Sequence, residues 1–215
     1  MIKENLSAIY SELPSAVKLV AVSKFHPVEE LKEAYAAGQR LFGENRPQEL
    51  AAKVPQLPDD IQWHFIGHLQ TNKLKLVLPY AALVESVDSV HLLEAVDRWG
   101  RENGRIIPIL LELHLGAEES KQGLTEAEIR QVLARDWPGV SIRGLMGMAT
   151  HTEDEALIRA DFARISALQQ SLRQQYPGLT ELSIGMSGDW RIAVEYGATL
   201  VRIGTAIFGP RPLSR

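Results

Sequence analysis

The chain of 215 residues is 45% hydrophobic and 23% charged, contains no cysteine and carries a formal net charge of −4. These values are ordinary for a globular protein, and the length suits one domain, residues 1–215, with a sizeable core. They exclude disulfides, thiolate catalysis and cysteine-ligated metals, and they give no reason to expect nucleic acid or an anionic membrane as partner. The N-terminal segment lacks the apolar core of a secretory signal, and no apolar run is long enough to span a bilayer, so we expect a cytoplasmic protein.

Along the chain, apolar runs typical of strands alternate with segments of helical periodicity. Residues 2–13 have apolar side chains at spacings of four, three and four, which predicts an N-terminal helix. Most of the strand-like runs are almost continuously apolar, as are parallel strands that are covered on both faces. The predicted strands are 18–24, 40–45, 62–67, 82–87, 106–115, 141–149, 181–186 and 199–208.

Helix-start signals lie between these runs. Thr125 with Glu128 and Thr152 with Glu155 have the spacing of capping boxes, in which side chains satisfy the first free N–H groups of a helix. Pro27 suits the first turn of a helix that follows the first strand.

Eight β/α units in one chain predict an α/β fold, a (β/α)8 TIM barrel with an extra N-terminal helix. An open doubly wound sheet is the alternative. Such a sheet normally binds a nucleotide through a glycine-rich first turn, whereas residues 23–27 contain no glycine. The missing glycines favour the barrel.

Barrel active sites gather at the C-terminal ends of the strands, and Lys24 ends the first predicted strand. Desolvation disfavours an ammonium ion and lowers the pKa of the amine, which makes it nucleophilic. Such amines form Schiff bases with carbonyl compounds, including pyridoxal phosphate (PLP). Taken alone, the same pattern also fits a solvated lysine that merely ends a strand.

The ends of the last two strands form a candidate phosphate site. Ser187 stands at the expected N-cap of a helix that begins near Asp189, and Gly204 and Thr205 follow the eighth strand. Barrels often hold phosphate between these two loops through backbone N–H groups. Tight turns would use the same residue types.

Arg202 lies inside the apolar eighth run, where a buried guanidinium needs a partner. Either it pairs with a strand-end carboxylate such as Glu112, or it contacts a ligand in the barrel mouth. His64 and His68 are four residues apart but lie on a strand and its exit, so their spacing does not converge as on a helix, and we expect no metal site.

These residues carry a resemblance to the pyridoxal phosphate homeostasis proteins, the single-domain relatives of the alanine racemase N-terminal barrel. The matching segments run in order over nearly the whole chain. They are AVSK (21–24), FGEN (42–45), WHFIG with LQ and NK (63–73), SVD (86–88), ESKQG (119–123), RGLM (143–146), LS with GMS (182–187) and VRIGTAIFG (201–209).

The resemblance implies a PLP barrel of fold type III, in which Lys24 forms the Schiff base and Arg202 faces the pyridine nitrogen. An arginine there cannot give up a proton, so the nitrogen stays unprotonated, and the ring becomes a poorer electron sink. The remaining implied site residues surround the phosphate or line the cofactor. They are Ser183, Ser187, Gly204 and Thr205 around the phosphate, with Asn45, Ser86 and Met146 along the cofactor.

The chain departs from the usual family pattern at a few positions that we expect at the pocket rim or one step beyond it. They are Arg46, Pro47, His68 and Glu85.

The favoured function is a PLP-binding protein that holds the cofactor on Lys24 and acts in intracellular PLP homeostasis or carriage, without robust catalysis. Apo-PLP enzymes are the expected recipients, and we expect a monomer. The alternative is an amino-acid racemase, which needs a second acid/base group opposite the lysine. In the racemases that the chain resembles, this group is a tyrosine from a separate C-terminal domain, and we expect no such domain after the eighth strand.

A third interpretation is a phosphate-binding isomerase that works without PLP. It would need a strand-end carboxylate as its base, and Glu44, Glu85 and Glu112 are the candidates.

Overall fold

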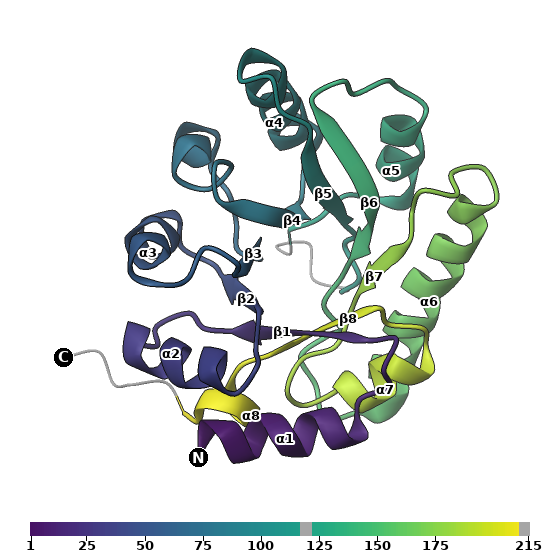
Figure 1. Cartoon of the computed structure of the whole chain (residues 1–215). Coiled ribbons are helices and arrows are strands. Elements are labelled where there is room, and N and C mark those ends of the chain that lie inside the picture. Colours follow the sequence, from purple (N-terminus) through teal and green to yellow (C-terminus); the bar gives the residue numbers. More distant parts are fainter. Residues whose placement is uncertain (117–121, 211–215) are drawn as a thin grey trace.

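In the computed structural model, which describes residues 1–116 and 122–210, eight parallel strands close into a barrel in sequence order. Figure 1 shows the ring of strands with the helices outside it. This confirms the predicted TIM barrel. The strands are β1 (Lys18–Val22), β2 (Leu41–Glu44), β3 (Gln62–Phe65), β4 (Ala81–Val87), β5 (Ile107–Glu112), β6 (Val140–Met146), β7 (Glu181–Ser183) and β8 (Leu200–Ile203).

The ring closes where the last strand meets the first. Leu19 and Ala21 of β1 lie opposite Val201 and Ile203 of β8 in parallel register. Every strand therefore has two neighbours, and the edge at which another chain could pair is absent from the described barrel.

Helices follow most of the strands, and the extra N-terminal helix is present. This helix, α1, buries Ile2, Leu6 and Ile9 and packs against α2 and α8 (Figure 1). A 3-10 helix stands after β3 in place of an α-helix. The helices are α1 (Ile2–Glu12), α2 (Val28–Ala36), α3 (Pro47–Lys53), η1 (Val54–Gln56), η2 (Thr71–Leu76), α4 (Val90–Glu102), α5 (Glu126–Leu133), α6 (Glu155–Arg173), α7 (Trp190–Glu195) and α8 (Thr205–Phe208).

Successive residues of a strand point to opposite faces, so the barrel has two apolar layers. The large layer lies between strands and helices and includes Leu19 and Ala21. A smaller cluster contains Val20, which alternates with them, and therefore lies inside the barrel. Its buried members are Val20, Leu83, Leu110, Met146 and Leu200.

The capping signals give a mixed outcome. Thr125 and Glu128 form the predicted capping box at the start of α5. The predicted box at Thr152 is wrong, because Asp154 is the N-cap of α6 and its Oδ1 accepts a hydrogen bond from Ala156 N at 2.9 Å. Asp is as strong a cap as Thr or stronger, and it stands directly before the first helical residue.

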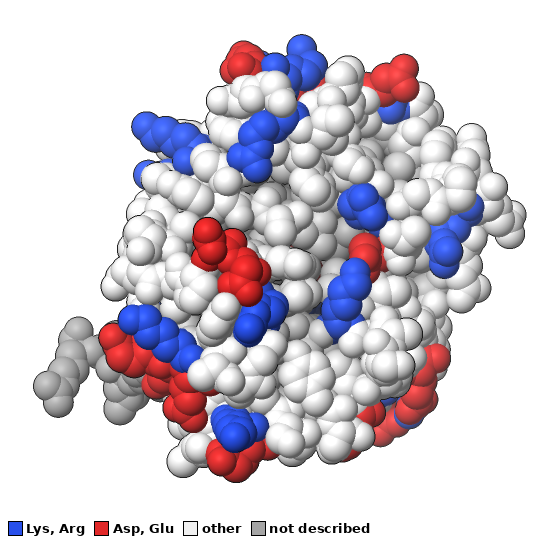
Figure 2. All heavy atoms as spheres, viewed as in Figure 1, with Lys and Arg blue, Asp and Glu red and all other residues white. Residues whose placement is uncertain are grey.

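Among the described residues, no helix has both the length and the apolar character needed to cross a bilayer. Residues 119–121 of the matching segment ESKQG, which include Lys121, lie outside the described residues. On the face shown in Figure 2, lysines and arginines are interspersed with aspartates and glutamates rather than forming one continuous basic surface.

Candidate functional site

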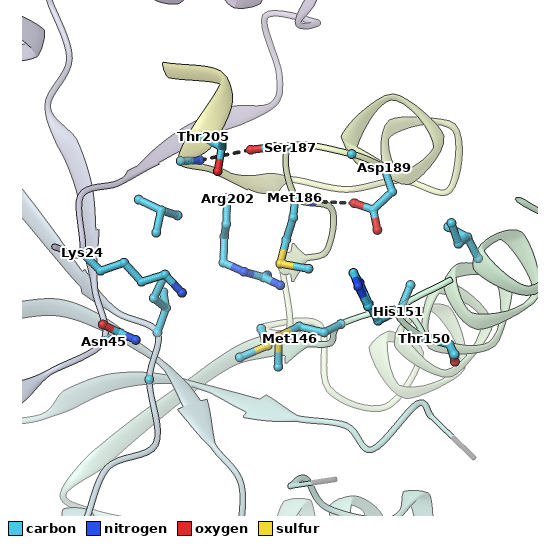
Figure 3. Close-up of a pocket in the computed structure, with 18 of the residues that line it drawn as sticks. Lys24, Asn45, Met146, Thr150, His151, Met186, Ser187, Asp189, Arg202 and Thr205 are labelled. Carbon is cyan, nitrogen blue, oxygen red and sulfur yellow. Dashed lines mark hydrogen bonds between the residues drawn. The ribbon is translucent and has the colours of Figure 1, made fainter. Parts of the chain in front are cut away.

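A cavity of about 570 Å³ opens at the C-terminal ends of the strands. Its walls come from segments that are far apart in the sequence, because the barrel brings all eight strand ends to one rim. Most of the predicted site residues line it, and Figure 3 shows their side chains around a common space. They are Lys24, Asn45, Met146, Ser187, Arg202, Gly204 and Thr205.

Lys24 stands two residues beyond the end of β1, in a turn that His26 N closes by donating to Ser23 O at 3.1 Å. The lysine is half-buried. Its side chain extends into the cavity from one wall, with Asn45 close to it and Arg202 across the space (Figure 3). The amine and the guanidinium therefore face the same volume.

The loops after β7 and β8 meet on a second wall. Ser187 Oγ accepts a hydrogen bond from Gly204 N at 3.3 Å, and Thr205 begins α8 directly beside it (Figure 3). The predicted N-cap role of Ser187 is wrong, because Asp189 is the N-cap of α7 and its Oδ1 accepts from Met186 N at 2.6 Å. Ser187 is tied across to the next loop instead, which places its hydroxyl beside Gly204 and Thr205.

Asn45 and Gly67 bring the ends of β2 and β3 together at the cavity. A Cβ atom on Gly67 would lie 2.2 Å from Asn45 O, so only glycine permits this approach. The Asn45 Oδ1 atom is buried and has no hydrogen-bond partner among the described residues. A ligand that donates a hydrogen bond would satisfy it.

Arg202 is buried, yet it reaches the cavity. Its Nη1 donates to Ser183 O at 2.9 Å and to Ser183 Oγ at 2.6 Å, and its Nη2 donates to Gly147 O at 3.0 Å. The carboxylate that pairs with it is Glu85, 3.8 Å away, and not the predicted Glu112. The guanidinium is thus fixed from behind while it faces the cavity.

Glu85 lies inside the barrel, fully buried, and is one contact removed from the cavity because it faces Arg202 from behind. His64 Nδ1 lies 2.6 Å from Glu85 Oε1, and Ser183 Oγ donates to Oε2. Burial alone would raise the pKa of Glu85, but the hydrogen bond and charge of His64, the charge of Arg202 and the Ser183 hydroxyl together hold it below its usual range. Glu85 is two residues from the interior Leu83, a spacing that could have revealed its direction.

Two predicted site residues do not line the cavity. Ser183 is fully buried between Glu85 and Arg202, and Ser86 Oγ donates to Gly67 O behind the wall. The three carboxylates proposed as an isomerase base, Glu44, Glu85 and Glu112, are buried and also do not line it.

Glu112 lies beside a further group of titratable side chains. It is 4% exposed, and burial together with the charge of Asp88 raises its pKa to about 7, against the lowering effects of Arg202 and His68. Asp88 Oδ2 lies 2.9 Å from His68 Nδ1. Within residues 1–116 and 122–210, no group of three or more His, Cys, Asp or Glu side chains could hold a metal ion.

The fold and the site define a class of protein, the barrel of the alanine racemase N-terminal domain. The model of that domain matches residues 1–212. Two relatives named pyridoxal phosphate homeostasis protein are each 38% identical to the chain. The alignment with the Vibrio alginolyticus protein spans 230 residues and covers 99% of this chain and 99% of that protein. The alignment with the Schizosaccharomyces pombe protein spans 204 residues and covers 93% of this chain and 86% of that protein. The chain belongs to the pyridoxal phosphate homeostasis protein family.

Solved structures of similar fold agree with this family assignment. PipY of Synechococcus elongatus with PLP bound is 42% identical, with a TM-score of 0.90 over 97% of this chain and 100% of that one. Alanine racemase from Bartonella henselae is 16% identical, with a TM-score of 0.76 over 100% of this chain and 60% of that one, a likeness of fold alone.

Proposed function

We propose that the chain binds PLP in the cavity at the strand ends, holds it as a Schiff base on Lys24 and acts in PLP homeostasis as a non-catalytic carrier. The observation that carries the proposal is the meeting of Lys24, Arg202 and the Ser187–Gly204–Thr205 wall in one cavity, in a chain 42% identical to a protein solved with PLP bound.

The cavity fits such a ligand in size and in chemistry. Its volume of about 570 Å³ falls within the range of small-molecule sites. The buried Asn45 Oδ1 needs a donor, and the Lys24 side chain extends into the same cavity from the adjoining wall. PLP supplies an aldehyde, which condenses with an amine. It also supplies a ring, which accepts electrons.

In this proposal each wall of the cavity has its own task. Ser187, Gly204 and Thr205 bind the phosphate through hydroxyl and backbone N–H groups, Asn45 and Met146 line the ring, and Arg202 faces the pyridine nitrogen. Ser183 acts behind the wall by holding Arg202. Ser86 acts in the same way by holding Gly67.

Arg202 also supports a carrier over an enzyme. A guanidinium is a permanent donor and does not transfer a proton to a ring nitrogen. The electron-accepting capacity of the ring is then reduced, which disfavours removal of an α-proton from an amino acid.

We propose that the protein is a monomer and that apo-PLP enzymes receive the cofactor.

One observation favours the second candidate function, an amino-acid racemase. His151 and Asp189 line the cavity away from Lys24 (Figure 3). Burial raises the pKa of Asp189, partly offset by its hydrogen bond from Met186 N and by Arg202. Either side chain could serve as the acid/base group opposite the lysine that a two-base racemase requires.

The test is an absorbance spectrum of the protein mixed with PLP, before and after borohydride reduction, followed by mass mapping of the modified peptide. Wild type should show a Schiff-base band that reduction converts into a stable adduct on Lys24. Lys24→Ala should lose both, and Lys75→Ala, which removes an exposed lysine of η2, should keep both. A band that persists in Lys24→Ala would refute the assignment.

Carrier and racemase are then separated by the optical rotation of L-alanine incubated with the loaded protein. A carrier leaves the rotation unchanged relative to free PLP. A decay that His151→Phe or Asp189→Asn abolishes would establish the racemase.

A further inference from the structure

The turn that carries Lys24 has an unusual backbone. Phe25, its neighbour, has a φ of 67° and is the only residue other than glycine with a positive φ in residues 1–116 and 122–210. An aromatic side chain in this left-handed region is strained, because its Cβ crowds the adjacent carbonyl oxygen. Such strain persists only where the surroundings enforce it, and it gathers at functional sites.

The backbone on both sides of Lys24 is held by side chains that lie outside the cavity. Phe25 N donates to Glu49 Oε1 at 2.7 Å. On the other side, Lys53 Nζ donates to Ser23 O at 2.8 Å. Glu49 and Lys53 are one helical turn apart on α3, so one helix reaches both flanks of the lysine.

A second carboxylate completes the arrangement. Lys53 Nζ also donates to Glu49 Oε1 and to Glu44 Oε1, both at 2.7 Å, and Ser23 Oγ donates to Glu44 Oε1 at 2.6 Å. Glu44 is fully buried and Lys53 is 5% exposed. We call these three residues, Glu44, Glu49 and Lys53, the α3 clamp.

Stability alone does not explain the clamp. Removing a lysine and two carboxylates from water costs free energy that their attraction often does not return, so a role in fixing local geometry has to be considered for this set. Burial raises the pKa of Glu44, while Lys53 and Ser23 act to lower it. From outside, the Arg46 guanidinium lies 4.4 Å from the centre of the Phe25 ring and covers the strained residue.

We infer that the α3 clamp is a positioning device for Lys24, which holds the turn of residues 23–26 with Phe25 in the left-handed conformation and so presents the lysine amine to the cavity. None of the three clamp residues lines the cavity. Glu49 and Lys53 act through the backbone atoms Phe25 N and Ser23 O, and Glu44 holds Lys53 and the Ser23 hydroxyl. The inference rests on the proposed function of Lys24.

The inference concerns one covalent step. Lys24 Nζ adds its lone pair to the aldehyde carbon of PLP, a C=N bond replaces the C=O bond, and the oxygen leaves as water with the protons of the amine. This step depends on the position of Lys24 Nζ. The hydrogen bonds to the phosphate do not depend on that position. A misplaced amine should therefore weaken Schiff-base formation without weakening contacts to the rest of the ligand.

The experiment separates these two quantities. PLP reports the Schiff base by its absorbance, and 4-deoxypyridoxine phosphate, which has no aldehyde, reports the other contacts by calorimetry. In Glu49→Ala, the equilibrium constant of Schiff-base formation should fall about tenfold, as expected for one lost hydrogen bond to a charged group, while the Kd of the analogue stays unchanged.

Two further variants sharpen the result. Glu49→Gln keeps an acceptor for Phe25 N and should recover most of the loss. Gln48→Ala, at an exposed neighbouring position of α3, should match wild type. If Glu49→Ala does not fold, Glu49→Asp, which draws the carboxylate back by one carbon, is judged by the same criterion.

Each outcome decides the matter. An unchanged Schiff-base constant in a folded variant overturns the inference, and so does an equal loss of affinity for PLP and for the analogue, which would indicate a merely structural cluster. Failure of the proposed function looks different: wild type itself would then form no adduct on Lys24, whatever its affinity for the analogue.

Discussion

At the scale of single residues, the buried group His64, Glu85, Ser183 and Arg202 sets the geometry of the site. A charged pair inside a barrel is costly unless every polar atom finds a partner. Here Glu85 meets His64, Ser183 and Arg202, while Arg202 also satisfies two carbonyl oxygens. The position of Arg202 therefore depends on residues that never reach the cavity.

Removal of one partner should expose this dependence. Arg202→Met should lower the free energy of unfolding by about 3 kcal/mol, because it removes one of the positive charges that face the fully buried Glu85 carboxylate. Glu85→Gln should also destabilise, and the double variant should lose less than the sum of the two. Urea unfolding of the four proteins gives the coupling, with the exposed Arg143→Met as control. Strictly additive losses would show that the two groups do not interact.

Residues of this kind mark a limit of sequence reasoning. The place of Lys24 at the cavity could be predicted, because it ends an apolar run and the strand ends of a barrel meet at one rim. Glu49 and Lys53 could not, since a Glu and a Lys four residues apart on a helix usually form a solvated surface pair. Only the packing of α3 against the turn of residues 23–26 buries Lys53, and that contact joins segments that no local pattern connects.

At the scale of elements, a helix-capping signal in the sequence predicts the start of the helix correctly where no stronger cap residue stands beside it. The capping box of α5 is one such case, with Glu128 N donating to Thr125 Oγ1 at 3.2 Å and Thr125 N donating to Glu128 Oε2 at 2.8 Å. At α6 a stronger cap, Asp154, stands between Thr152 and the first helical residue, Glu155. Thr152 instead accepts a hydrogen bond from Asp154 N.

The α5 cap leads to a quantitative prediction. Thr125→Ala should lower the free energy of unfolding by about 1 kcal/mol, because the first turn loses an acceptor for a free N–H group. Gln131→Ala, at an exposed position of the same helix, should change it little. Parallel urea titrations measure both. Equal effects at the two positions would mean that the box adds nothing to stability.

Strand bounds were predicted less well than strand identities. The run of residues 106–115 extends beyond β5, since Leu113 and Leu115 are buried in the loop that follows, and Leu113 forms an isolated bridge to Leu124. An apolar pattern reports burial, and it does not distinguish a strand from a buried loop.

At the scale of the whole molecule, the eightfold alternation together with the glycine-free first turn predicted the barrel, and the meeting of the strand ends at one rim follows from that fold. The pattern could not predict the charge state of the interior, which depends on distances between strands. Glu112 is the clearest example. Its pKa of about 7 arises from burial and from Asp88, which belongs to a different strand end.

This group should affect stability as a function of pH. The native carboxyl binds its proton more tightly than the unfolded one, whose pKa is near the ordinary 4.5, so the stabilisation is present below that value and is lost as the pH rises towards about 7. The loss should be on the order of 3 kcal/mol.

Unfolding of wild type and Glu112→Gln over this pH range measures the difference, which should grow in favour of the variant as the pH rises. Asp88→Asn removes the neighbouring charge and lowers the native pKa of Glu112, so the loss should become smaller and be complete at a lower pH. Parallel curves for wild type and Glu112→Gln would show that Glu112 ionises in the native state as it does in the unfolded chain.

The pairing of the first strand with the last, which closes the ring, also determines when the site comes into existence. Lys24 leaves the ribosome before Gly204 and Thr205, because it precedes them along the chain. An unfinished chain therefore displays the lysine without the wall that faces it. Capture of a ligand by both walls therefore requires that the last strand has already paired with the first.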